Sequence, residues 1–207
     1  MPLTAIEQLP ADQVVWGFPG AGGGFDQDDR LTGSLLPVVF FGTLDAYNHQ
    51  TERGRAAREV FRGAGFRIGE SSDFRGWLLV HFVQNAGLHT QTLRLGDMSK
   101  LTTQDVREAI LATRELFPLL EARGVDLRRH RGELLPFTAP VRLAAPALAL
   151  LVTRFPPTRR VMTAHANPEE LRAVCRDTLA EARRLGVPAP RLEAAEPWFT
   201  ETGRFKN

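Results

Sequence analysis

The signals for β-strands are confined to the first third of this chain, and this division restricts the folds that it can adopt more than any other feature. Two apolar runs, Val14–Phe18 and Leu35–Phe41, are rich in β-branched and aromatic residues, which is typical of buried strands. A helix rich in arginine is predicted over Thr51–Gly63, and a returning strand over Phe66–Gly69. The order strand, strand, helix, strand predicts a small α/β unit in residues 1–72.

From Asp73 onward the sequence predicts helices and almost no strands. The last long helix has clear signals at both ends, because Asn167 is a good N-cap, Pro168 suits the first helical position, and Gly186 can end the helix. Residues 73–207 are therefore predicted to form an all-helical domain after the α/β unit, so that the chain as a whole is mainly α. The predicted long helices span residues 74–95, 102–123, 141–154 and 167–185.

Composition excludes several classes of function. The 26 cationic residues are interspersed with 24 acidic ones, which gives no support to nucleic-acid binding. A single cysteine, Cys175, cannot form an intrachain disulfide or a cysteine-rich zinc site, so we predict no metal site and expect a reducing, cytoplasmic location. The longest apolar run, Leu143–Val152, is about half as long as a bilayer span requires and contains Pro146, so no membrane segment is predicted.

Three polar residues are spaced four apart on the predicted helix 74–95. His81, Asn85 and His89 should therefore lie on one face of a helix whose other faces are mostly apolar. Burying an uncompensated polar group costs roughly 1–3 kcal/mol, so such a stripe should face a cleft, a partner or a polar network. A cleft is the functional interpretation. The alternative is that the stripe bonds to nearby backbone groups or to water on an amphipathic surface.

The segment Pro19–Gly24 is rich in glycine and follows a predicted strand, which suggests a loop that could cradle a phosphate. Its spacing does not complete a G-x-G-x-x-G fingerprint, because the third glycine would fall at Phe25. The acidic residues that follow, Asp26, Asp28 and Asp29, would also repel an anionic cofactor. We expect a loop that lies beside a ligand with close backbone approach.

Several of these features together resemble the ketopantoate reductase family. They are a strand with a Pro-Gly loop, an antiparallel strand, a helix ending in A-G-F at Ala64–Phe66, a helix start with D-x-x-x-W at Asp73–Trp77, and a late acidic helix followed by G-V-P-A-P at Gly186–Pro190. The resemblance covers nearly the whole of this chain, but it corresponds only to the later, C-terminal part of the family pattern. It implies a Rossmann domain that binds NADP through G-x-G-x-x-G, then an all-helical domain, with the substrate in the cleft between them.

On this resemblance, residues 1–72 are the C-terminal part of a Rossmann-like domain and residues 73–207 are the helical domain. The α/β unit is then a Rossmann remnant, because the first half of that domain, with its fingerprint, is absent from the sequence. The family loop has an asparagine before its glycine, and here Pro19 precedes Gly20, which makes these two residues weak candidates for cofactor contacts. An open sheet edge left by missing strands would invite pairing, so a homodimer is expected.

The family motif W-x-K-x-x-x-N supplies a catalytic lysine and a substrate-binding asparagine. Alignment on Trp77 places Leu79 and Val83 at these two positions. A shift of two residues instead places His81 as the catalytic proton donor and Asn85 as the substrate-binding amide.

The substrate-binding glutamate of the family lies sixteen residues before a glycine, and counting back from Gly186 gives Glu170. An acid in the first turn can also simply stabilise the helix dipole. The resemblance implies NADP-dependent reduction of a 2-keto acid to a 2-hydroxy acid, as in pantothenate biosynthesis, with a small-molecule substrate. We expect this chain to be inactive alone. The alternative is a non-catalytic protein that binds a small molecule or a partner.

Overall fold

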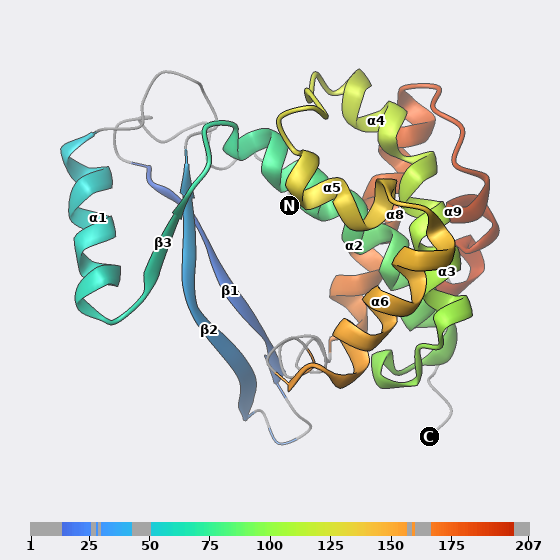
Figure 1. The fold of residues 1–207 in the computed structure, drawn as a ribbon, viewed down its shortest axis with the longest axis horizontal. Helices are drawn as coiled ribbons and strands as arrows, with labels where there is room; N and C mark the ends of the chain where they lie inside the picture. Colours follow the sequence, from blue (N-terminus) through green and yellow to red (C-terminus); the bar gives the residue numbers. More distant parts are fainter. Residues whose placement is uncertain are drawn as a thin grey trace.

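The computed structural model describes residues 14–25, 28, 30–42, 51–156, 159 and 167–200. Figure 1 shows a small sheet with helix α1 (Glu52–Gly63) on one side and a larger body of helices on the other. Helix α2 (Phe74–Leu95) runs from the sheet into the helical body. The protein is mainly α with a small mixed sheet, as the sequence predicts. The division into two domains at residue 73 stays a prediction.

The sheet has three strands in the order β1-β2-β3 among the described residues. Strand β1 (Trp16–Phe25) pairs antiparallel with β2 (Leu31–Gly42), and β2 pairs in parallel with β3 (Arg67–Glu70). Helix α1 makes the crossover between the two parallel strands. The predicted order of elements is thus confirmed.

The predicted loop at Pro19–Gly24 is wrong, because β1 continues through this segment. The glycines pair with β2, with Gly22 opposite Ser34 and Gly24 opposite Thr32, after a bulge between Pro19 and Ala21. Glycine has a poor intrinsic preference for strands. Here a long uncharged partner strand supplies the ladder hydrogen bonds, which local propensity does not reveal.

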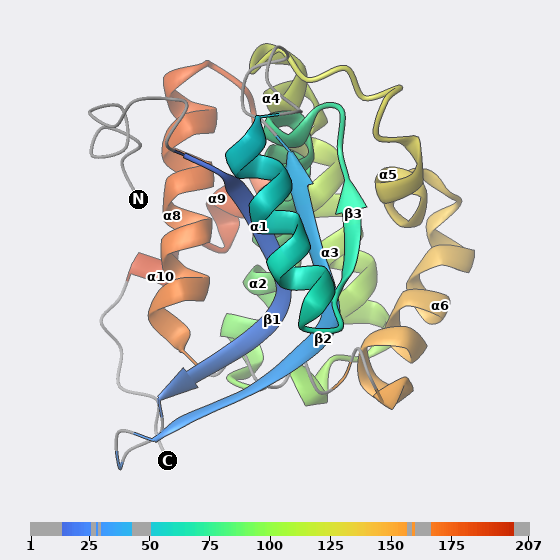
Figure 2. The same cartoon turned by 90° about the vertical axis from the view of Figure 1, so that its left-hand side faces the viewer.

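Each face of the sheet packs against a helix at the end where α2 begins. On one face, Phe41 is buried and contacts Phe61 of α1 with ring centroids 5.6 Å apart. Arg58 of α1 lies over the Phe41 ring at 4.9 Å. On the other face, Phe40 stacks on Trp77 of α2 at 4.9 Å. Helix α1 and helix α2 therefore enclose this end of the sheet, and Figure 2 shows the rest of the β1–β2 hairpin extending beyond α1.

Helix α2 has the bounds that the sequence predicts. Asp73 caps its first turn by accepting from the Gly76 amide at 2.9 Å, and Gly96 ends it in the left-handed conformation with φ 71°. Within the helical body, α2 packs against α3 (Thr103–Glu115) and α8 (Pro168–Arg184). This helix is thus both the link to the sheet and the centre of the helical part.

The predicted helix 102–123 is broken at Leu116 into α3 and α4 (Phe117–Ala122). Pro118 in the first turn of α4 cannot donate a backbone hydrogen bond to the preceding turn, which accounts for the break. The helix predicted over 167–185 is confirmed as α8, with Asn167 as its N-cap. The other described helices are η3 (Met98–Lys100), α5 (Arg131–Thr138), α6 (Val141–Arg154), α9 (Pro190–Ala194) and α10 (Glu196–Thr200).

The helical part contains two clusters of buried apolar residues. The larger cluster joins α2, α4, α8, α9 and α10, and includes Val80, Leu120 and Phe199. The smaller cluster joins η3, α3, α5 and α6. Among the described residues no single helix is both long and apolar enough to cross a bilayer; α5 and α6 reach that length only as a pair bent by 111°.

Candidate functional site

His81 and Asn85 are the two predicted site residues that the structure places in contact. His81 Nε2 and Asn85 Nδ2 lie 3.1 Å apart, and both side chains are half-buried on α2. The four-residue spacing therefore produces a hydrogen-bonded pair, as expected for neighbours on one helix face. His89, the third member of the stripe, is only 7% exposed and belongs to the interior.

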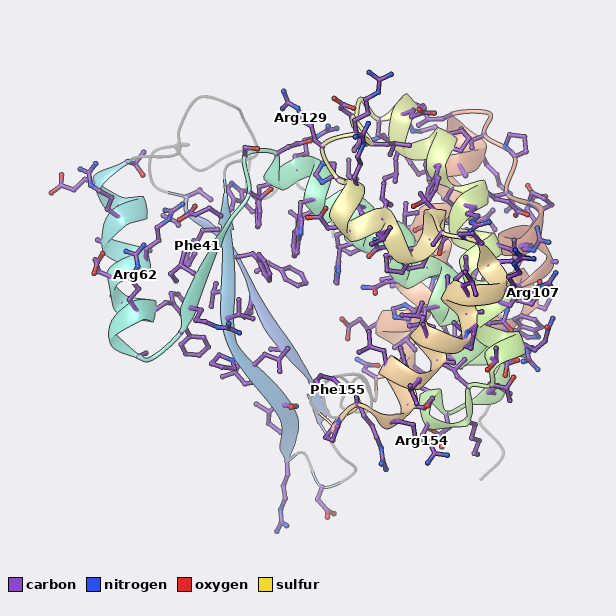
Figure 3. All side chains as sticks on the ribbon, in the orientation of Figure 1. Phe41, Arg62, Arg107, Arg129, Arg154 and Phe155 are labelled. Carbon is purple, nitrogen blue, oxygen red and sulfur yellow. The ribbon has the colours of Figure 1, made fainter. Side chains whose placement is uncertain are left out.

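Aromatic rings fix the position of the His81 imidazole. It stacks on Trp77 at 5.6 Å with an angle of 6° between the planes, and the Phe18 ring of β1 meets it edge-on at 4.8 Å. Trp77 in turn stacks on Phe74 at 5.8 Å and meets Phe18 edge-on at 5.2 Å. His81 thus lies where β1 meets α2, and Figure 3 shows side chains between the sheet and the helical body.

This arrangement can hold an oxygen atom of a small molecule. In the orientation of the amide, Asn85 donates to His81 Nε2, which favours a neutral imidazole with its proton on Nδ1. The imidazole and the amide are N–H donors of the kind that bind carbonyl and carboxylate oxygens. Stacking on Trp77 restricts rotation of the imidazole, so its donor has a defined direction.

Glu170 lies in the first turn of α8, where it is exposed. Its neighbour Leu171 is buried in the larger cluster, and Cys175 Sγ, one turn further on, lies 3.7 Å from the Ala86 carbonyl of α2. The first half of α8 therefore packs close to the part of α2 that carries Asn85. Convergence of Glu170 on the His81–Asn85 pair stays a prediction.

Strand β1 connects the two regions that the sequence singles out. Near its start, Phe18 contacts His81. At its far end, a Cβ placed on Gly24 would lie 3.8 Å from the backbone nitrogen of Asn167, the N-cap of α8. A strand that contains five glycines between Trp16 and Phe25 can approach both helices closely because it presents little side-chain bulk.

The residues that would have held an NADP phosphate do not fit that group. Pro19 is exposed, whereas Gly20 packs against Val38 and Leu36, within 3.0 and 3.2 Å of the place where a Cβ would stand. Both belong to a strand paired with β2, so this segment is not a loop whose amides converge on an anion. The turn after it carries Asp28, which is exposed. No group of acidic, histidine and cysteine residues among the described part of the chain could hold a metal ion.

Cys175 lies in the interior, as expected for a small apolar side chain. Burial raises the pKa of its thiol to about 12, so the sulfur stays protonated and unreactive at neutral pH.

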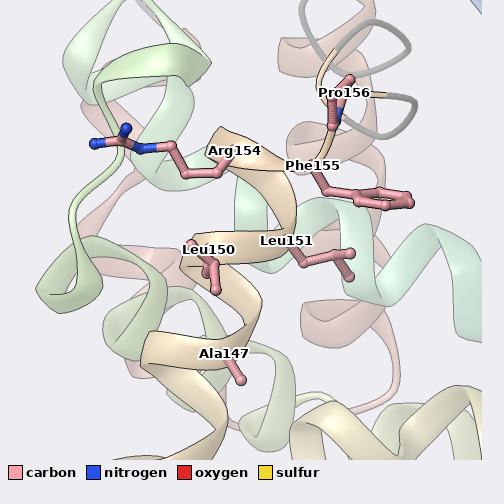
Figure 4. A pocket seen from close by; sticks show the side chains of 6 residues that line it. All are labelled: Ala147, Leu150, Leu151, Arg154, Phe155 and Pro156. Carbon is pink, nitrogen blue, oxygen red and sulfur yellow. The ribbon is translucent and has the colours of Figure 1, made fainter.

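Helix α6 exposes apolar residues that the sequence did not mark as a surface. A hollow of about 390 Å³ lies at its C-terminal end. Figure 4 shows Leu151 and Phe155 extending to the same side of the helix, while Arg154 extends to the other. Leu150 is 63% exposed and Phe155 51% exposed. The hollow is lined by Ala147, Leu150, Leu151, Arg154, Phe155 and Pro156.

The sequence did not reveal that Phe18 contacts His81 or that Phe40 stacks on Trp77. Phe18 and Phe40 lie opposite each other in the β1–β2 pair and so share one face of the sheet, and only the tertiary arrangement shows that this face meets α2. No protein family, curated protein or solved structure matches this chain. The functional interpretation therefore rests on the sequence and on the geometry of the site.

Proposed function

We propose that this chain is the substrate-binding side of a ketopantoate-reductase-like protein and that it binds a small 2-keto acid at His81 and Asn85. The observation that carries the proposal is the hydrogen-bonded His81–Asn85 pair at the junction of β1 and α2. The parallel crossover β2–α1–β3 directly before α2 supports the assignment of residues 1–72 to the late part of a Rossmann-like domain. On this proposal the protein acts on a soluble metabolite in the cytoplasm.

His81 binds the keto oxygen of the substrate through a ring N–H and polarises the carbonyl group. Asn85 fixes the ring and offers its amide to the neighbouring carboxylate. As the proton donor to the carbonyl oxygen, His81 acts in its protonated form, in which both ring nitrogens are donors and the Asn85 amide presents its oxygen to the ring. Glu170 would bind a substrate hydroxyl from the α8 side. The chain alone is inactive on this proposal, because nothing in β1 binds a dinucleotide phosphate.

The binding role of the pair is tested by calorimetric titration with ketopantoate. Replacement of His81 by phenylalanine keeps an aromatic ring against Trp77 but removes the ring nitrogens, so we expect affinity to fall by about tenfold, equivalent to 1.4 kcal/mol. Asn85→Leu should weaken binding by a similar factor. Gln84→Leu is the matched control: Gln84 is adjacent on α2, but its amide donates to the Glu133 carbonyl at 2.9 Å. Equal affinities for all three variants would count against the proposal.

The second expectation is that the folded chain does not bind NADPH at micromolar concentrations. The sequence has no complete fingerprint, and four of the five glycines of β1 are paired with β2: Gly17, Gly22, Gly23 and Gly24. A calorimetric titration of the unsupplemented chain with NADPH decides this, with circular dichroism as the control for folding. Binding at micromolar affinity or tighter would overturn this part of the proposal.

A non-catalytic binding protein is the second candidate, because the hollow on α6 offers an apolar surface that includes neither His81 nor Asn85. Leu151→Lys would then reduce binding of an apolar ligand, while His81→Phe would leave it unchanged. The proposed function predicts instead that His81→Phe weakens the binding of ketopantoate and that Leu151→Lys leaves it unchanged. The same two variants therefore separate the two candidates.

A further inference from the structure

Half of one edge of β2 lacks a partner strand among the described residues. Strand β2 spans Leu31–Gly42 and pairs with β1 along one edge. On its other edge, β3 pairs only with Val38–Phe41. Figures 1 and 2 show the remaining part of β2 extending past both β3 and α1. The edge of residues 31–37 therefore presents backbone donors and acceptors that a further strand can use.

This edge also lacks the features that usually prevent strand pairing. No residue of β2 is charged. Leu31 is 72% exposed and Leu35 is 58% exposed, and both lie on the same face of the sheet because they are four residues apart. Only Pro37, which has no N–H to donate, interrupts the edge, so the segment open to pairing is residues 31–36.

We propose that this edge pairs with the same edge of a second copy of the chain, antiparallel about a two-fold axis at Gly33. The two leucines of the segment are equally far from that glycine, so Leu31 of each copy faces Leu35 of the other. A two-fold axis perpendicular to the sheet keeps all four leucines on one face, where they cover each other. The two sheets then form one continuous sheet.

The position of β3 is compatible with this register. Strand β3 occupies the edge of β2 from Val38 onward, where Arg67 lies opposite Val38. The pairing that sets Leu31 opposite Leu35 uses residues 31–35 of each copy, so the new pair ends before β3 begins.

The test is the molar mass in solution by light scattering, with the 23.0 kDa chain as the unit. The wild-type chain should have twice this mass, and Leu35→Glu should raise the dimer dissociation constant at least a hundredfold by placing carboxylates against the leucines at position 31. The matched control is Leu150→Glu on α6, where the leucine is equally exposed and the dimer should persist. A chain that carries both Leu31→Lys and Leu35→Glu should regain the dimer, because opposite charges then face each other across the axis.

Hydrogen exchange of the wild-type chain gives a second readout that needs no variant. The amides of residues 31–36 should become more protected as the protein concentration rises, whereas the amides of α2 should not change. A strictly monomeric wild-type chain at high concentration would overturn the proposal. So would a dimer that Leu150→Glu dissociates and Leu35→Glu does not, since the copies would then meet through α6.

Discussion

Replacing Gly87 with alanine is expected to destabilise the protein by about 3 kcal/mol, because α2 and α3 approach closely at this glycine. A Cβ at position 87 would lie 2.1 Å from Thr113 Oγ1 and 2.7 Å from the Ala109 carbonyl oxygen. The Thr113 hydroxyl is buried and donates to that same carbonyl at 3.0 Å, so neither group can move aside without losing a hydrogen bond. The two helices would have to separate.

Urea unfolding followed by circular dichroism measures this effect. Gly132→Ala is the matched control, since Gly132 is also in a helix but nothing lies within 4 Å of its added Cβ. Alanine there should be neutral or slightly stabilising. If Gly87→Ala unfolds at the same urea concentration as the wild type, the close approach of α2 and α3 at this glycine is contradicted.

Replacing Asp73 with alanine should lower the free energy of unfolding by about 2–4 kcal/mol, because this carboxylate has two structural roles. Its Oδ1 accepts from the Gly76 amide at 2.9 Å and so caps α2. Its Oδ2 lies 3.0 Å from Nε2 of His130, whose side chain is only 4% exposed. Loss of the carboxylate removes the cap and leaves a buried imidazole nitrogen without this partner. Asp97→Ala removes the cap of η3 at a more exposed position, and should cost about 1 kcal/mol or less.

The contribution of Asp73 should also depend on pH. Burial alone would raise the pKa of Asp73, but the hydrogen bonds from His130 and from the Gly76 amide outweigh it, and the pKa is lowered. The carboxylate therefore stabilises the folded state above its unfolded pKa of roughly 3.9, and this stabilisation is lost as the pH falls through the lower folded value. The difference in unfolding free energy between wild type and Asp73→Ala should shrink as the pH falls from about 6 to about 3, a range that includes that unfolded pKa. An unchanged difference would mean that the charge of Asp73 contributes nothing.

Local signals explain which elements could be predicted from the sequence. Helices α2 and α8 match their predicted bounds because capping residues mark their ends: Asp73 and Gly96 for the first, Asn167 and Gly186 for the second. Strand β1 could not be predicted through its glycines, because its stability comes from pairing with β2 and not from its own residues. The break at Leu116 could have been predicted, because Pro118 is a local signal that ends or kinks a helix.

The contacts of the candidate site likewise include some that the sequence could predict and some that it could not. The contact between His81 and Asn85 follows from their spacing on one helix, so the sequence could predict it. The contact between His81 and Phe18 joins residues far apart in the chain and depends on how the sheet packs against α2. His89 shares the spacing but not the environment, because α2 enters the helical body and buries it. Periodicity shows which residues share a face but not what that face meets along the length of a helix.

The most direct measurement of the central claim is the nuclear magnetic resonance signal of the His81 imidazole nitrogens during a titration with ketopantoate. Because the ring is stacked on Trp77 and bonded to Asn85, a substrate oxygen bound there must alter its nitrogen environment. We predict that the His81 nitrogen shifts move along a saturable curve, that the Asn85 amide moves with the same midpoint, and that the buried His89 ring stays unchanged. Saturable binding that leaves the His81 and Asn85 signals in place, or no binding to the folded chain, would contradict the account.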